Sequence, residues 1–269
     1  MDQSQLEPTA FNPERKSISQ DEAKRLTEVS KAFPGAYADT ILAEVRAKKG
    51  SYDARKRAIL QGQRAGKLWL KLIEGVPPQK QLEMIGLLDR RVSQVHDKLG
   101  IPKNGFLAGA KGEFATGVML VRSGLEVKYP PEQDDLYNKT DLMAFLSDGR
   151  KMRVQSKALK LPQSAGRQIS KDPVPIFSML RSDEDFARFR DAVVSIPSTD
   201  ESAFERISEI VQDAKIFRQM ALDKGDIPIY CLLDASESET SDIISATARP
   251  NKEAENQGLS ELDQIIKMA

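Results

Sequence analysis

The apolar run at residues 227–233, IPIYCLL, constrains the fold of this 269-residue chain most strongly. A run of this length without a charged residue is typical of a β-strand that is buried on both faces. The first hundred residues have no such run, and their apolar residues recur at helical spacing. The sequence therefore predicts a mixed α/β protein in which an all-helical N-terminal part precedes a sheet.

Composition excludes several classes of protein. Apolar residues make up 40% of the chain, and 40 Lys and Arg balance 40 Asp and Glu, which indicates a folded protein and not a disordered one. One His and one Cys argue against a zinc site built from several such side chains. The first 20 residues lack the apolar core of a signal peptide, and no segment has the roughly 18 apolar residues that cross a bilayer. We expect a cytoplasmic protein without a membrane partner.

The N-terminal hundred residues divide into a tail and a helical domain. Residues 1–18 are polar and lack periodicity, which predicts a disordered tail. Residues 19–104 predict a helical domain that opens with the capping-box spacing of Ser19 and Glu22. Pro34 and Gly35 predict a break between the first helix and the second. The expected helices after this break cover residues 36–49, 52–74 and 79–99.

Residues 105–234 change to a mixture of helix, strand and turn, and we expect a second domain there. A tight-turn signal at residues 147–150 (SDGR) predicts a β-hairpin. The expected order is a helix at 111–122, strands at 125–129, 140–146 and 151–158, a helical insertion at about 160–200, a helix at 202–222 and the buried strand. Residues 235–269 form the expected acidic C-terminal tail.

Basic residues are concentrated in two segments although the net charge is zero. Residues 43–71 carry nine basic and two acidic residues, a net charge of +7, and residues 150–171 carry seven basic residues and no acid. A single basic segment can simply be a solvated helix face. Two such segments instead favour binding of a partner with a phosphate backbone. The nucleic-acid-binding residues that we expect are Lys48, Lys49, Arg55, Lys56, Arg57, Arg64, Arg153, Lys160 and Arg167.

The predicted hairpin brings charged and polar residues together. Side chains alternate along a strand, so Arg153, Gln155 and Lys157 share one face. Pairing through the turn at 147–150 places Asp141 beside Gln155 and Lys157. Glu113 lies on the helix that precedes the strands.

These residues and their order resemble the PD-(D/E)xK nuclease superfamily of restriction-like enzymes and Holliday-junction resolvases. Thr140-Asp141 stands for the Pro-Asp of that motif, and Gln155-Ser156-Lys157 stands for the acid-x-Lys. The segment GEFATGVMLVRSGLEV resembles the first helix and strand of the family, with Glu113 in the place of the helix-borne acid. The likeness covers residues 111–158 well and 202–234 in outline, and it implies a restriction-endonuclease-like core of helix, three-stranded meander, helix and buried strand.

The resemblance also implies a reaction and a cofactor. Phosphodiester hydrolysis needs a positioned water and neutralisation of charge on the phosphate oxygens, both of which Mg²⁺ supplies, and Mn²⁺ can substitute for it. The implied metal ligands are Glu113, Asp141, the amide oxygen of Gln155 and the carbonyl of Ser156, and Lys157 is the implied activator of the water. Because Gln155 lacks the usual negative charge, we expect a single cation held with modest affinity.

We therefore expect a metal-dependent endonuclease of restriction type that acts on DNA, and a homodimer if both strands are cut at a symmetric site. A repair, recombination or toxin nuclease would have the same core. A DNA- or protein-binding module on a degenerate, non-catalytic nuclease fold is the alternative from a different class, and RNA remains open as the substrate.

Overall fold

The structure is a computed structural model, and it describes nine segments of the chain. These are residues 20–47, 52–74, 90, 93–101, 105–131, 140–159, 176–195, 201–234 and 265–268, with the side chains of some end residues left out. The expected disordered tail, residues 132–139 and most of the expected acidic C-terminal tail lie outside these residues. No helix in the described segments is both long enough and apolar enough to span a membrane.

Two long helices begin the fold, α1 (Gln20–Ala47) and α2 (Tyr52–Glu74), and they pack against each other. The expected ends of α2 are confirmed. The expected break at Pro34 is wrong, because α1 continues through it. Proline removes one backbone donor from a helix. Here the neighbouring side chains of Phe33 and Tyr37 are fully buried, and this packing outweighs the local cost.

The helix α4 (Gly105–Arg122) joins the N-terminal helices to the sheet through one shared core. It begins six residues before the expected start, and it ends as expected at Arg122, two residues before Gly124, whose φ is 80°. The ring of Trp69 on α2 lies 5.1 Å from that of Phe114 on α4, and its Nε1 donates to the Phe114 carbonyl at 3.2 Å. The expected boundary at residue 105 therefore does not separate two hydrophobic cores.

Gly66 of α2 lies directly against the ring of Tyr129 and leaves no room for a larger side chain. A Cβ added at Gly66 would overlap the ring of Tyr129, which is buried. Gly66→Ala should therefore lower the free energy of unfolding by about 1–3 kcal/mol, as overpacked sites do, although alanine favours helices. Gly35→Ala is the matched control, because that exposed helical position has no atom within 4 Å and should gain about 0.5–1 kcal/mol. Urea unfolding of both variants measures the contrast, and equal changes would contradict it.

The sheet has five strands in the order β1-β2-β3-β5-β4. The strands are β1 (Glu126–Lys128), β2 (Leu142–Phe145), β3 (Lys151–Leu159), β4 (Ile176–Met179) and β5 (Ile227–Asp234). The first three form an antiparallel meander, with the expected turn carrying Gly149 at a φ of 85°. The next pair, β3 and β5, is parallel, and β4 adds an antiparallel edge. This arrangement confirms the mixed α/β class and the helical N-terminal part.

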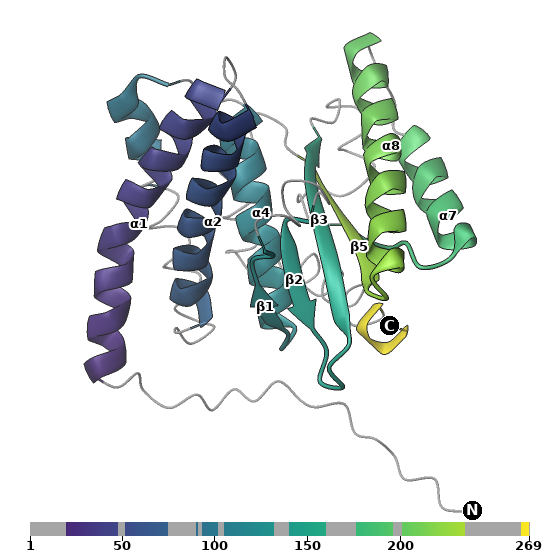
Figure 1. The fold of residues 1–269 in the computed structure, drawn as a ribbon, viewed down its shortest axis with the longest axis horizontal. Helices are drawn as coiled ribbons and strands as arrows, with labels where there is room; N and C mark the ends of the chain where they lie inside the picture. Colours follow the sequence, from purple (N-terminus) through teal and green to yellow (C-terminus); the bar gives the residue numbers. More distant parts are fainter. Residues whose placement is uncertain are drawn as a thin grey trace, which may run out of the picture.

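Helices cover both faces of the sheet (Figure 1). On one face lies α4, with α2 and α1 beyond it, and on the other lie α7 (Asp183–Val194) and α8 (Glu201–Asp223). As expected, β5 is buried on both faces: Ile229 and Cys231 belong to the core shared with α4, whereas Tyr230 belongs to the core under α7 and α8. The expected helical insertion at 160–200 is wrong in part, because β4 lies within it.

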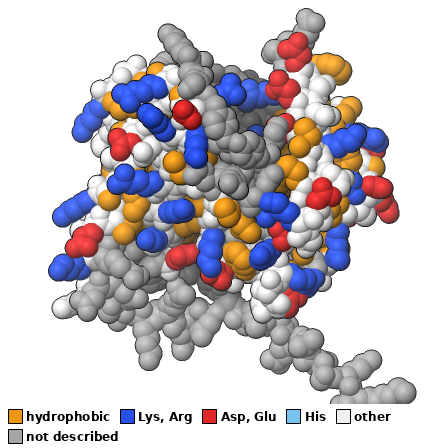
Figure 2. Space-filling view, viewed as in Figure 1, with side chains coloured by type: hydrophobic (Ala, Val, Ile, Leu, Met, Phe, Trp, Pro, Cys, Tyr) orange, Lys and Arg blue, Asp and Glu red, His pale blue; other side chains and the backbone are white. Residues whose placement is uncertain are grey.

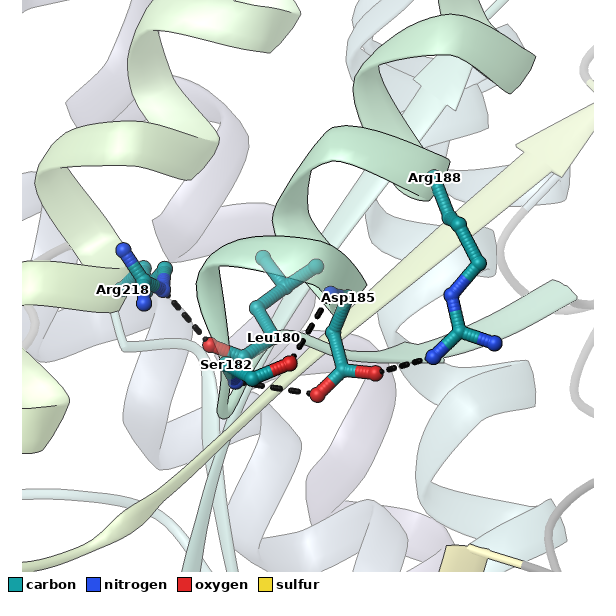
Figure 3. A network of polar contacts seen from close by, with 5 residues as sticks. All are labelled: Leu180, Ser182, Asp185, Arg188 and Arg218. Atoms are coloured by element: carbon teal, nitrogen blue, oxygen red, sulfur yellow. Dashed lines mark hydrogen bonds and ion pairs between the residues drawn. The ribbon is translucent and has the colours of Figure 1, made fainter.

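A polar network fixes the end of β4 against α7 and α8 (Figure 3). Ser182 caps α7 by accepting from the Asp185 amide at 3.0 Å, and Asp185 accepts in return from the Ser182 amide at 2.9 Å. From α8, Arg218 Nε donates to the Leu180 carbonyl at 2.9 Å. Ser182 is thus the N-cap of α7, in a capping box with Asp185. The network sets the position of α8 on the sheet.

The described end of the chain also contacts the core. Residues 265–268 are helical, and Ile265 is buried in the cluster that α1, α2, α4 and the sheet share. Part of the expected acidic tail therefore packs on the folded protein.

Candidate functional site

The register of the β2–β3 hairpin places Asp141 beside Gln155, as the sequence predicts. Leu142 pairs with Val154, and the backbone amide of Asp141 donates to the Val154 carbonyl at 3.0 Å. The residue before Leu142 therefore lies opposite the residue after Val154. This position is the end of the hairpin farthest from its turn.

The Asp141 carboxylate is held by two donors from β3. Its Oδ2 accepts from Gln155 Nε2 at 2.9 Å and from the backbone amide of Ser156 at 2.7 Å. Gln155 is almost fully buried, whereas Asp141 is partly exposed. Hydrogen bonds to a carboxylate stabilise its ionised form, so the site presents a fixed negative charge at the end of β2.

The predicted alternation along β3 is also confirmed. Arg153 binds Asp226 at 2.6 Å, and Lys157 Nζ lies 3.8 Å from Asp213 Oδ2 on α8, so both side chains lie on the α8 face. Gln155, between them, shares that face. Lys157 is about one third exposed, which leaves its ammonium accessible to a ligand.

The opposite face of β3 contacts α4. Thr116 Oγ1 lies 3.2 Å from Ser156 Oγ and 3.3 Å from Cys231 Sγ. Complete burial raises the pKa of the Cys231 thiol to about 12, so it stays protonated and acts as a core residue and not as a nucleophile.

Glu113 lies one turn before Thr116 on α4, and it is partly buried. It approaches from the α4 face, whereas Gln155 and Lys157 project to the α8 face. The structure thus brings together Asp141, Gln155 and Ser156, with Lys157 on the same strand. The role of Glu113 as a second carboxylate stays a prediction.

Two residues of the site were not predicted from the sequence. Asp213 comes from α8, and no pattern in the sequence indicates which turn of that helix faces β3. Tyr230 is the register partner of Gln155 on β5, and its buried hydroxyl has no hydrogen-bond partner among the described residues. Burial raises the pKa of Tyr230, and the carboxylates of Asp213 and Asp141 raise it further, so the phenol stays neutral. The one signal for Tyr230 was a polar atom inside an apolar run.

The predicted nucleic-acid-binding residues have different environments. Arg55, Lys56, Arg57 and Arg64 are exposed on α2, where Arg57, Arg64, Lys67 and Lys71 follow helical spacing along one side. In Figure 2 basic side chains are spread over both halves of the molecule with acidic side chains among them. Arg153 is buried in its ion pair, so it does not belong to an exposed surface. Lys48, Lys49, Lys160 and Arg167 lie outside the described residues.

The oxygen atoms of Asp141 and Gln155 supply part of the ligand set that a hard cation requires. Mg²⁺ is usually held by one or two carboxylates together with waters and substrate phosphate. Asp141 supplies one carboxylate, and Gln155 supplies a buried amide oxygen that has no hydrogen-bond partner within the described part of the chain. No three His, Cys, Asp or Glu side chains in the described segments form a metal-binding group. Such a site would bind Mg²⁺ weakly without substrate.

Comparisons of the chain with protein-family models, with curated proteins and with solved structures found no match. The residues and their geometry are therefore the basis for inferring a function.

Proposed function

We propose that the protein is a Mg²⁺-dependent endonuclease that hydrolyses phosphodiester bonds in DNA, with a restriction-like core formed by α4, the sheet and α8. The observation that carries this proposal is the contact of Asp141 with Gln155 and Ser156, on a strand whose next residue is Lys157. The order of helix, antiparallel meander, helix and parallel strand supports it, because the resemblance to the nuclease superfamily implies this order.

Each residue has a role that its chemistry allows. Asp141 would hold the cation, and the amide oxygen of Gln155 would join it once the amide has turned from its hydrogen bond to Asp141. The cation would supply charge neutralisation and a more acidic water. Lys157, on the same face as Gln155, orients the attacking water and stabilises the negative charge that develops on the phosphate oxygens. Asp213 positions the Lys157 ammonium.

The exposed basic side of α2 supplies contacts to the phosphate backbone. Such contacts give affinity without sequence information. A restriction enzyme, a repair or recombination nuclease and a nuclease toxin would all share these features.

One observation favours a second function, a non-catalytic DNA-binding module. Gln155 donates its amide N–H to Asp141, so the pair is hydrogen-bonded without a cation. Two carboxylates at these positions would repel each other and require a cation or a proton. A protein that has lost catalysis could keep the hydrogen-bonded pair and still bind DNA through α2.

Cleavage of duplex, single-stranded and branched DNA by the purified protein tests the proposal. We expect cutting with Mg²⁺ or Mn²⁺, none with EDTA, and DNA binding that weakens steeply as salt rises. Salt-sensitive binding without cutting in any metal would instead support the non-catalytic module. No binding at any salt concentration would contradict both functions.

A further inference from the structure

The helix α2 runs antiparallel to β1, so its two ends lie at opposite ends of the sheet. Gly66 lies against the ring of Tyr129, the residue after β1. One turn earlier on α2, Gln63 donates to the Pro130 carbonyl at 3.2 Å. The β1–β2 register, continued by two residues, places Pro130 opposite Asp141. The start of α2 therefore lies at the end of the sheet that carries the proposed cation site.

The contacts at the other end of α2 agree with this direction. Burial raises the pKa of Glu74, and the nearby charge of Glu126 at the start of β1 raises it further. Glu126 pairs with Phe145, which precedes the hairpin turn, so it lies at the end of the sheet away from Asp141. Figure 1 shows the junction of α1 and α2 at the top and the turn of the hairpin at the bottom.

Arginine side chains extend from α2 beyond the level of Asp141. Arg57 and Arg55 are exposed, six and eight residues before Gln63. At 1.5 Å per residue, they lie about 9–12 Å further along the helix axis than Gln63 does. On the sheet, β3 continues past Gln155 toward the same end, and it carries Lys157 there.

The end of α1 adds to this group of cations. A Cβ at Gly62 would lie 3.7 Å from Thr40, so the exposed Arg46, six residues later on α1, lies beside the first turns of α2. Residues 44–47 and 52–57 carry four basic and two acidic side chains, which gives a net positive charge. We define the basic end by its four cations, which are Arg46, Arg55, Lys56 and Arg57.

We propose that the basic end binds the phosphate backbone of duplex DNA beside the scissile bond, so that the duplex lies across the end of the sheet that carries Asp141 and Lys157. Arginine suits this role, because its guanidinium can bind a phosphate through two parallel hydrogen bonds. This inference rests on the proposed function, and it names the part of the helical region that holds the substrate.

The combined variant Arg55→Gln with Arg57→Gln tests the surface. Loss of two phosphate contacts should reduce the slope of log affinity against log salt by about two, and weaken duplex binding about tenfold or more. Lys24→Gln with Lys31→Gln is the matched control, because it removes two exposed charges from the opposite half of α1 and should change both quantities far less. Fluorescence anisotropy of a labelled duplex over a salt series measures affinity and slope.

Cleavage shows whether the DNA on the basic end is the DNA that reaches the site. We expect Arg55→Gln with Arg57→Gln to lower kcat/KM for cleavage about as much as it lowers affinity, and the control pair to keep the wild-type value. Lower affinity with unchanged kcat/KM would overturn the placement of the duplex. Equal losses of affinity in the two pairs, or no loss in the first, would overturn the basic end as the binding surface.

Two further outcomes separate this inference from the proposed function. Loss of affinity confined to the first pair, in a protein that does not cut DNA with any metal, would contradict the proposed catalysis but support DNA binding at the basic end. Absence of DNA binding by the wild type at any salt concentration would overturn both.

Discussion

Asp226→Ala is expected to lower the free energy of unfolding by about 3–5 kcal/mol, the usual cost of removing one partner from a buried ion pair. Asp226 Oδ2 accepts from Arg153 Nε at 2.6 Å, and both side chains are about nine-tenths buried. Alanine would remove this carboxylate from a buried guanidinium. Arg153 also donates to Thr140 Oγ1 at 3.5 Å, so the variant should loosen the segment that carries Asp141. Urea unfolding measures the loss.

The hairpin turn provides the matched control. Asp148 binds Arg150 with similar geometry, at 2.6 Å, but both side chains are about half exposed. Asp148→Ala should therefore change stability little. The combined variant Arg153→Met with Asp226→Ala should recover much of the loss, because no unpaired charge stays buried. A large loss that persists in the combined variant would contradict this explanation.

Gln155→Glu is expected to have opposite effects on stability and on cation binding. It would place a second carboxylate beside Asp141 at a position that is 2% exposed. Without a cation, the buried charge should cost about 3 kcal/mol or more. With Mg²⁺ present, the added carboxylate should raise the affinity of the site for the cation by roughly tenfold or more. Loss of a residue that only supports a metal ligand typically lowers metal affinity by about this factor, and a carboxylate that binds the cation directly should have at least as large an effect. Thermal unfolding across a Mg²⁺ titration measures both effects.

Gln63→Glu separates a cation effect from a general one. Gln63 is also buried, and it donates to the Pro130 carbonyl at 3.2 Å, away from Asp141. This substitution should destabilise the protein as well, and Mg²⁺ should not restore it. Equal rescue of the two variants by Mg²⁺, or rescue of neither, would rule out a cation site at Asp141 and Gln155.

Local chemistry in the sequence was enough to predict several elements. The tight turn before Arg150 fixed the hairpin register, and this register alone places Asp141 opposite Gln155. The alternation along β3 correctly assigned Gln155 and Lys157 to one face. These features depend on neighbours in sequence or on one paired strand.

Features that depend on tertiary packing were not predicted. Pro34 stays inside a helix because the buried rings around it hold α1 in place. The edge strand β4 has only four residues and pairs with a distant strand. The contact of Asp213 with Lys157 depends on how α8 is rotated about its axis. Nothing in the sequence indicates that Arg153 is buried in an ion pair with Asp226.

Cleavage by wild type and by Asp141→Asn, measured side by side on supercoiled plasmid with Mg²⁺ and then with EDTA, tests the central claim most directly. We predict that wild type nicks or linearises the plasmid only with the cation, that Asp141→Asn loses this activity, and that Asp148→Asn at the hairpin turn keeps it. Equal cutting by wild type and Asp141→Asn, or cutting that persists in EDTA, would show that Asp141 does not hold a catalytic cation.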